Sequence, residues 1–177
     1  MPLVLLLLLA SALSLVAFVH VQRTASRPVL ALALLKHRVL SPAVMASYLM
    51  FLAVFVNWFI LPFYISDALK VDAKSLGFLL MLTPAAGAVA SPMGGWISDR
   101  FPPAYLTTLA LVIVTGGMFL FSLLSADSTV AQVALRMGAV GAGIGLFQAA
   151  NATLIMSAVP EDRLGTGGAI LSISRTM

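Results

Sequence analysis

The sequence predicts an all-α, polytopic membrane protein. Of its 177 residues, 61% are hydrophobic and 9% are charged, whereas soluble domains carry roughly 25% charged residues. The mean hydropathy is +1.08, and apolar stretches long enough to cross a membrane alternate with short polar breaks. A soluble core cannot hold this much apolar surface, so we expect a lipid bilayer to surround most of the chain.

A helix needs about 20 mostly apolar residues to cross a bilayer. Five stretches reach this length and a sixth is cut short, at residues 3–21, 41–65, 75–97, 104–124, 128–152 and 165–177. At 1.5 Å per residue the sixth covers only about 18 Å of a hydrocarbon core that is ~30 Å thick. The predicted architecture is therefore five full spans plus a truncated sixth, as in a fragment of a longer protein.

The polar breaks carry the residues that end one helix and begin the next. Asp72 is expected to cap the third span. Pro102 or Pro103 is expected to start the fourth, because Pro is tolerated in the first helical turn. The sequences SADS (125–128) and PEDRLG (160–165) separate the later spans.

Three segments are expected along the chain. For residues 1–21 we weigh a retained membrane helix against a secretory signal peptide, and favour the helix because the basic start of a signal peptide is missing. Residues 22–40 are too short to span, and we expect a cytoplasmic linker containing an interfacial helix. Residues 41–177 would then form the main helical bundle.

Loop charges predict the orientation of the chain. Six basic residues fall in the breaks of one side, namely Arg23, Arg27, Lys36, Arg38, Arg100 and Arg163. The alternate breaks hold only Lys70 and Lys74, which Asp67 and Asp72 offset. The more basic side is therefore expected to be cytoplasmic.

The overall composition also limits the partners and cofactors. The pI near 10.0 comes from basic residues scattered through the breaks, without the basic stripe that binds nucleic acid, so a lipid bilayer and not nucleic acid is the expected partner. The chain has no cysteine, which excludes disulfides and Cys-ligated zinc. We expect no cofactor and no metal site.

The break GGWISDRF, at residues 94–101, admits two interpretations. It is either an ordinary polar turn or a latch at the cytoplasmic end, because a glycine pair allows close backbone approach and Asp and Arg can pair with another loop. A latch predicts at least one contact within about 4 Å between this loop and the one near residue 162. The candidate gate residues are Gly95, Asp99, Arg100, Glu161, Asp162 and Arg163.

GGWISDRF resembles the first half of the signature of the major facilitator superfamily: Gly, three residues, Asp, then Arg or Lys. Its second half is absent, because Pro102, Pro103 and Ala104 stand where the family has Gly and two basic residues. Residues 27–41, 61–100 and 159–177 are similar in order and spacing to fourteen-helix drug:proton antiporters. The resemblance implies the C-terminal half of such a transporter, with an N-terminal bundle outside this chain as its partner.

Polar residues within the apolar stretches are the candidates for a substrate cavity, because charge in a membrane is costly unless paired or hydrated. Arg136 lies about 12 Å into the fifth span and Arg175 about 15 Å into the sixth. For Arg136, outward snorkelling is weighed evenly against a cavity role; for Arg175, the alternative to the cavity is satisfaction by carbonyls or a missing helix. Asn57, Gln148 and Asn151 are also candidates, although interhelical hydrogen bonding is the first expectation for each.

Glycines recur along the fifth span, at positions 138, 141, 143 and 145. Gly141 and Gly145 form a GxxxG pattern. Such small residues let two helix backbones approach closely, so we expect helix packing here and not ligand binding.

None of the six acidic residues lies within a predicted span. Proton coupling usually needs an embedded carboxylate or His, so a coupled proton would be carried outside this chain. His20 and His37 lie at or beyond the cytoplasmic end of the first span and are interpreted as solvated. The same absence argues against an intramembrane enzyme, which would need a Ser–His pair, paired Asp residues or metal ligands at depth.

These observations together predict a secondary active transporter in the cell membrane. We expect proton-driven efflux of drugs or other small molecules, with two bundles rocking about a midplane site. The alternative is a sugar or metabolite carrier of the same superfamily. A purely structural subunit is disfavoured, because an inert bundle has no reason to hold Arg175 within the membrane.

Overall fold

The computed structural model describes residues 2–24, 37–125, 128–160 and 164–176. Within these ranges the chain is helical and has no β-strand, which confirms the all-α prediction. The helices are α1 (Pro2–Thr24), α2 (Leu40–Asp67), α3 (Ala73–Ser98), α4 (Pro103–Ser122), α5 (Val130–Ser157) and α6 (Leu164–Thr176).

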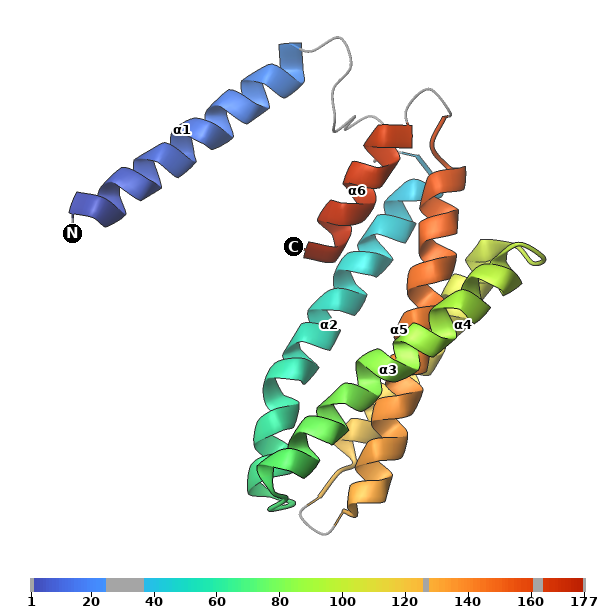
Figure 1. Ribbon diagram of the computed structural model, residues 1–177. Helices are drawn as coiled ribbons and strands as arrows, with labels where there is room; N and C mark the ends of the chain where they lie inside the picture. The colour runs from blue at the N-terminus through green and yellow to red at the C-terminus, as the bar shows by residue number, and fades with distance from the viewer. Residues whose placement is uncertain (1, 25–36, 126–127, 161–163, 177) are drawn as a thin grey trace.

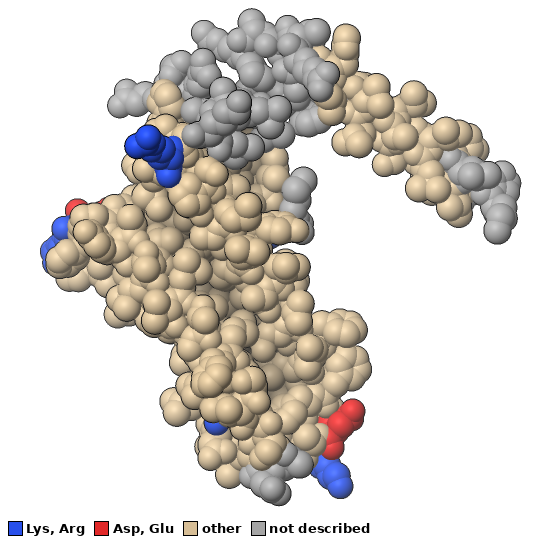
Figure 2. Space-filling view, turned by 180° about the vertical axis from the view of Figure 1, so that it is seen from behind, with Lys and Arg blue, Asp and Glu red and all other residues tan. Residues whose placement is uncertain are grey.

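Four helices, α2 to α5, are long and apolar enough to cross a membrane. The apolar part of α1 that meets the same composition, Leu6–Val21, is shorter, so the crossing of the membrane by α1 stays a prediction. Helix α6 has 13 described residues, fewer than the roughly 20 that a membrane crossing needs. Most of the charged residues in Figure 2 lie toward the ends of the molecule, and the long middle of this face is uncharged.

Helices α2 to α6 run alternately up and down in one bundle, whereas α1 stands apart from it (Figure 1). The start of α2, the turn between α3 and α4, and the end of α5 lie at one end of this bundle. The α2–α3 and α4–α5 connections lie at the other end, so the connections alternate as the sequence predicts.

The contact between α3 and α5 is the most extensive in the described bundle, and glycines meet there. A Cβ atom on Gly141 would collide with the carbonyl oxygen of Thr83, and one on Gly145 with the carbonyl oxygen of Gly87. Two backbones thus touch where no side chain could fit, and the prediction that Gly141 and Gly145 serve packing is confirmed. Gly138 differs, since a Cβ there would meet open space.

Helix starts follow the predicted cap residues. Asp72 caps α3: its carboxylate accepts from the Ser75 hydroxyl at 2.6 Å and from the Ser75 backbone N–H at 3.4 Å. These two hydrogen bonds hold the pKa of the exposed Asp72 carboxyl below its ordinary value. Pro103 occupies the first turn of α4, as expected. The sequence analysis missed the reciprocal capping box of Thr129 and Gln132, which starts α5.

Two sequence predictions fall on parts of the chain outside the described residues. The interfacial helix expected within residues 22–40 depends mainly on residues 25–36, and the second gate loop depends on residues 161–163. Of the linker, the structure describes the end of α1 at Thr24 and the exposed segment His37–Val39 that precedes α2.

Candidate functional site

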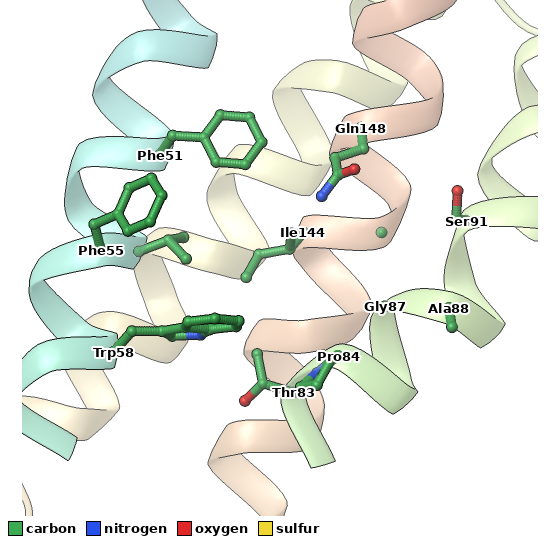
Figure 3. A pocket seen from close by; sticks show the side chains of 12 residues that line it. Phe51, Phe55, Trp58, Thr83, Pro84, Gly87, Ala88, Ser91, Ile144 and Gln148 are labelled. Carbon is green, nitrogen blue, oxygen red and sulfur yellow. The ribbon is translucent and has the colours of Figure 1, made fainter. Parts of the chain in front are cut away.

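A pocket of about 440 Å³ lies between α2, α3 and α5 and is the candidate site, because it combines aromatic side chains with the polar amide of Gln148. Figure 3 shows its three walls, one from each helix. The residues that line it are Phe51, Val54, Phe55, Trp58, Thr83, Pro84, Gly87, Ala88, Ser91, Ile144, Gly145 and Gln148.

The α2 wall is aromatic. Phe51, Phe55 and Trp58 follow one another at spacings of four and three residues, so they share one face of the helix. Figure 3 shows the three rings stacked along α2 and directed toward α3 and α5. Trp58 remains 52% exposed, so the ring is free to meet a ligand on its open side.

The opposite walls are hollow because their residues are small. On α3 the lining includes Gly87, Ala88 and Ser91, and on α5 it includes Gly145. Gly87 and Gly145 are also in direct backbone contact, which closes the pocket between the two helices. The same glycines that join α3 to α5 therefore leave the space that the aromatic wall faces.

Gln148 supplies the main polar group of the pocket. Its amide extends from α5 toward the aromatic wall (Figure 3). Thr83 also lines the pocket, but its hydroxyl donates to the Met137 carbonyl at 3.4 Å. The lining residues include no Lys, Arg, Asp, Glu or His. The site is therefore apolar and aromatic, with one amide to orient a ligand, as is common for small-molecule pockets.

Asn151 lies one helical turn beyond Gln148 but does not line this pocket. It is 2% exposed, and its Nδ2 donates to the Ser47 Oγ of α2 at 2.6 Å. The interhelical hydrogen bond expected for Asn151 is thus confirmed. Its Oδ1 is buried and has no hydrogen-bond partner in the described part of the chain.

Asn57 lies at a second, smaller pocket of about 130 Å³ between α2 and α4. The sequence made Asn57 a candidate for the substrate cavity, and its role in substrate binding stays a prediction; the structure places it away from the aromatic pocket. The reason is helical geometry: consecutive side chains are turned by about 100°, so Asn57 and Trp58 face different neighbours.

Arg136 is half-buried on α5, between the core residues Val133 and Met137. Its Nη1 atom is buried and has no hydrogen-bond partner among the described residues. Arg136 is not part of the aromatic pocket lining. The structure therefore places a guanidinium within the apolar bundle without bringing it to Gln148.

Arg175 lies near the end of α6 and is half-buried. Within the described ranges it has no ion-pair partner, and the sequence itself has no acidic residue inside any span. Helix α6 packs beside the start of α2 (Figure 1), and a cavity-facing role for Arg175 stays a prediction.

At the candidate gate, Arg100 stacks on its own helix. Its Cζ lies 3.8 Å from the centroid of the Trp96 ring, a cation–π contact. Asp99 and Arg100 are both exposed, and Asp99 caps the end of α3 through its backbone N–H. A contact with Glu161, Asp162 or Arg163 lies outside the described residues, so the latch stays a prediction.

The two glycines of this motif, Gly94 and Gly95, have different surroundings, which the sequence did not reveal. A Cβ on Gly94 would lie 3.1 Å from the Cα of Leu146, whereas one on Gly95 would meet nothing within 4 Å. Gly94, and not Gly95, is thus the residue that allows α3 and α5 to approach at this end. The placement of Gly95 in the gate motif rests on the signature alone.

Sequence reasoning missed the aromatic wall because it searched for polar residues inside apolar stretches. The signal was present as three aromatic residues on one face of α2, at positions 51, 55 and 58. Aromatic residues at helical spacing usually pack in a core. Here the small residues opposite them on α3 and α5 leave a pocket, and this distinguishes a pocket wall from a core.

The fold defines a class of protein: a polytopic helical bundle with a pocket between its spans. A sequence profile described as Major Facilitator Superfamily matches residues 2–177. The chain therefore belongs to the major facilitator superfamily, a family of multi-pass membrane transporters and not of enzymes.

Curated relatives agree with this membership. The uncharacterized transporter YebQ of Escherichia coli (strain K12) is 30% identical over 160 residues, which are 90% of this chain and 35% of the relative. The riboflavin transporter RibZ of Clostridioides difficile (strain 630) is 26% identical over 67% of this chain and 26% of its own length. The methylenomycin A resistance protein of Bacillus subtilis (strain 168) is 25% identical over 98% of this chain and 38% of its own length. The chain thus spans about a third of the length of these relatives.

Proposed function

We propose that this chain is part of a secondary active transporter that exports drugs or other small molecules by alternating access. The observation that carries the proposal is the pocket of about 440 Å³ between α2, α3 and α5, with an aromatic wall and one amide. Relatives named for antibiotic resistance, such as the methylenomycin A resistance protein, support a drug as substrate.

The packing supports a division of labour between the helices. Gly141 and Gly145 of α5 lie against the backbone of Thr83 and Gly87 of α3. This glycine seam joins the two helices closely, so they would move as one body. Helix α2 is linked to α5 by the buried Asn151–Ser47 hydrogen bond, which lies one turn from both Gln148 and Phe51. This bond would keep the aromatic wall at a fixed distance from the amide while the two bundles rock about the site.

Proton coupling would depend on groups outside this chain. None of the six acidic residues lies within a predicted span, and a proton carrier in a membrane is usually an embedded carboxylate or His. We therefore assign the carrier to a second helical bundle, which would also face the half-buried Arg175.

Substitution of Arg175 tests whether its side chain contacts a second bundle or the substrate. In the full-length protein, Arg175→Ala should reduce transport at least tenfold at unchanged membrane abundance, because a charge at this depth needs water, a partner or a substrate. Arg175→Lys should restore transport only in part if the partner takes both arms of the guanidinium. Wild-type transport by Arg175→Ala would remove Arg175 from the cavity.

A metabolite carrier is the second candidate, and one observation favours it: a relative of this chain is named a riboflavin transporter. The two candidates share the same site and the same movement, and differ in whether the physiological substrate is a foreign compound or a metabolite.

The experiment uses the full-length protein in inside-out membrane vesicles with an imposed pH gradient. Uptake of fluorescent drugs and of riboflavin is followed with the gradient intact and after a protonophore collapses it. We expect uptake of at least one compound that stops with the gradient and is absent from vesicles without the protein. Uptake that is identical in both kinds of vesicle would contradict the proposal.

A further inference from the structure

We infer that the aromatic pocket selects uncharged, planar heteroaromatic molecules with a lactam or imide edge over planar cations. The inference deepens the proposed function and rests on the pocket being its substrate site. It follows from the aromatic rings of α2, the free amide of Gln148 and the absence of a carboxylate from the pocket lining.

The ring faces set the shape of the ligand. Phe51, Phe55 and Trp58 form one wall, and the opposite wall of Gly87, Ala88 and Gly145 has almost no side chain. A flat ligand can stack on the rings and still fit against the small residues, whereas a bulky one would collide with the α3 backbone. Stacking of this kind accepts any aromatic ring, so shape alone does not choose between neutral and charged ligands.

The Gln148 amide supplies the chemical choice. It is half-buried, directed toward the aromatic wall in Figure 3, and has no hydrogen-bond partner in the described part of the chain. A carboxamide offers one N–H donor edge and one acceptor oxygen side by side. A lactam or imide presents the complementary acceptor and donor in the plane of its ring. Such a ligand can stack on the aromatic wall and exchange two hydrogen bonds with Gln148.

The pocket disfavours a cation. Its lining has no carboxylate, and moving a charged group from water into an apolar site is costly unless a group of opposite charge pairs with it. The face of the Trp58 ring attracts cations. However, the pocket lining has no carboxylate that would bind a cation together with the ring. The uncharged ligand therefore fits better.

The test measures binding and transport separately in the full-length protein. The probes are lumichrome, an uncharged tricyclic imide, and ethidium, a cation with a planar tricyclic ring system; both are fluorescent. We expect lumichrome to bind the purified protein at least tenfold more tightly than ethidium. Gln148→Leu should weaken lumichrome binding about tenfold and leave ethidium nearly unchanged, because it removes the hydrogen bonds at similar side-chain size.

Two further variants complete the test. Gln148→Glu should shift the preference toward ethidium at least tenfold, since it places a carboxylate beside the rings. Phe59→Leu is the matched control: Phe59 is on α2, 73% exposed and outside the pocket lining, so both affinities should stay as in the wild type.

The outcomes separate this inference from the proposed function. Lumichrome binding with the expected Gln148 effects, but no transport of any compound, would overturn the transporter and leave the ligand class standing. Transport of ethidium with no lumichrome binding would overturn the ligand class and leave the transporter standing. Binding of neither probe, or equal binding in Gln148→Leu and wild type, would overturn the ligand class.

Discussion

At the scale of the residue, three polar side chains that look alike in the sequence have different surroundings in the structure. Asn57, Gln148 and Asn151 are all amides within apolar spans, and sequence alone favoured interhelical hydrogen bonding for each. Asn151 forms that bond with Ser47, while Gln148 faces the aromatic pocket and Asn57 a separate one. Which way an amide faces depends on where its neighbours pack, and a single sequence does not contain that information.

The buried pair Asn151–Ser47 gives a stability prediction. Ser47→Ala leaves the buried amide of Asn151 without its acceptor, so it should lower the free energy of unfolding by about 1–3 kcal/mol. Ser47→Ala combined with Asn151→Leu should cost less than the two single changes added together, because no buried polar group is then left unpaired. The measurement is a double-mutant cycle on the full-length protein in detergent. Strictly additive losses would show that the two side chains do not depend on one another.

At the scale of the element, the seam between α3 and α5 is the feature that the sequence predicted best. The GxxxG pattern of Gly141 and Gly145 predicted close packing, but it did not identify the partner helix. The structure supplies Thr83 and Gly87 on α3 as the facing residues. Long-range partners of this kind follow from the whole bundle, and no local pattern encodes them.

The glycine seam can be tested with one variant and one control on the same helix. Gly145→Val should destabilise the protein by about 1–3 kcal/mol or more, because its side chain would press on the Gly87 backbone. Gly138→Ala should be neutral or stabilising by up to about 1 kcal/mol, since a Cβ there meets open space and Ala favours helix. Thermal unfolding in detergent measures both. Equal effects of the two substitutions would contradict the seam.

The start of α3 gives a pH prediction. The pKa of Asp72 is lowered by its hydrogen bonds to Ser75, so its contribution to stability is fully present above the ordinary value of 3.8 and fades as the pH falls through the lower, folded value. Asp72→Ala should therefore lower the melting temperature at pH 7, and the difference should shrink below about pH 4. A difference that stays constant from pH 7 to pH 3 would show that the charge of Asp72 does not matter.

At the scale of the whole molecule, composition was enough to predict a polytopic helical bundle. A chain with so few charged and so many apolar residues needs a lipid bilayer around it. The alternation of the connections followed from loop charge, and the structure has the same alternation (Figure 1). The pocket could not be predicted in this way. It arises where the aromatic face of α2 meets the glycine seam, and α5, which is distant in the sequence, has to be placed against α2 and α3 before that space exists.

The central claim is that the space between α2, α3 and α5 is where the substrate binds, and filling it tests the claim most directly. Ala88 lines the pocket on α3, whereas Val89 is turned by about 100° to the outside. Transport by the full-length protein is measured for Ala88→Trp and Val89→Trp at equal membrane abundance. We predict that Ala88→Trp abolishes transport and that Val89→Trp retains it; wild-type transport by Ala88→Trp would contradict the account.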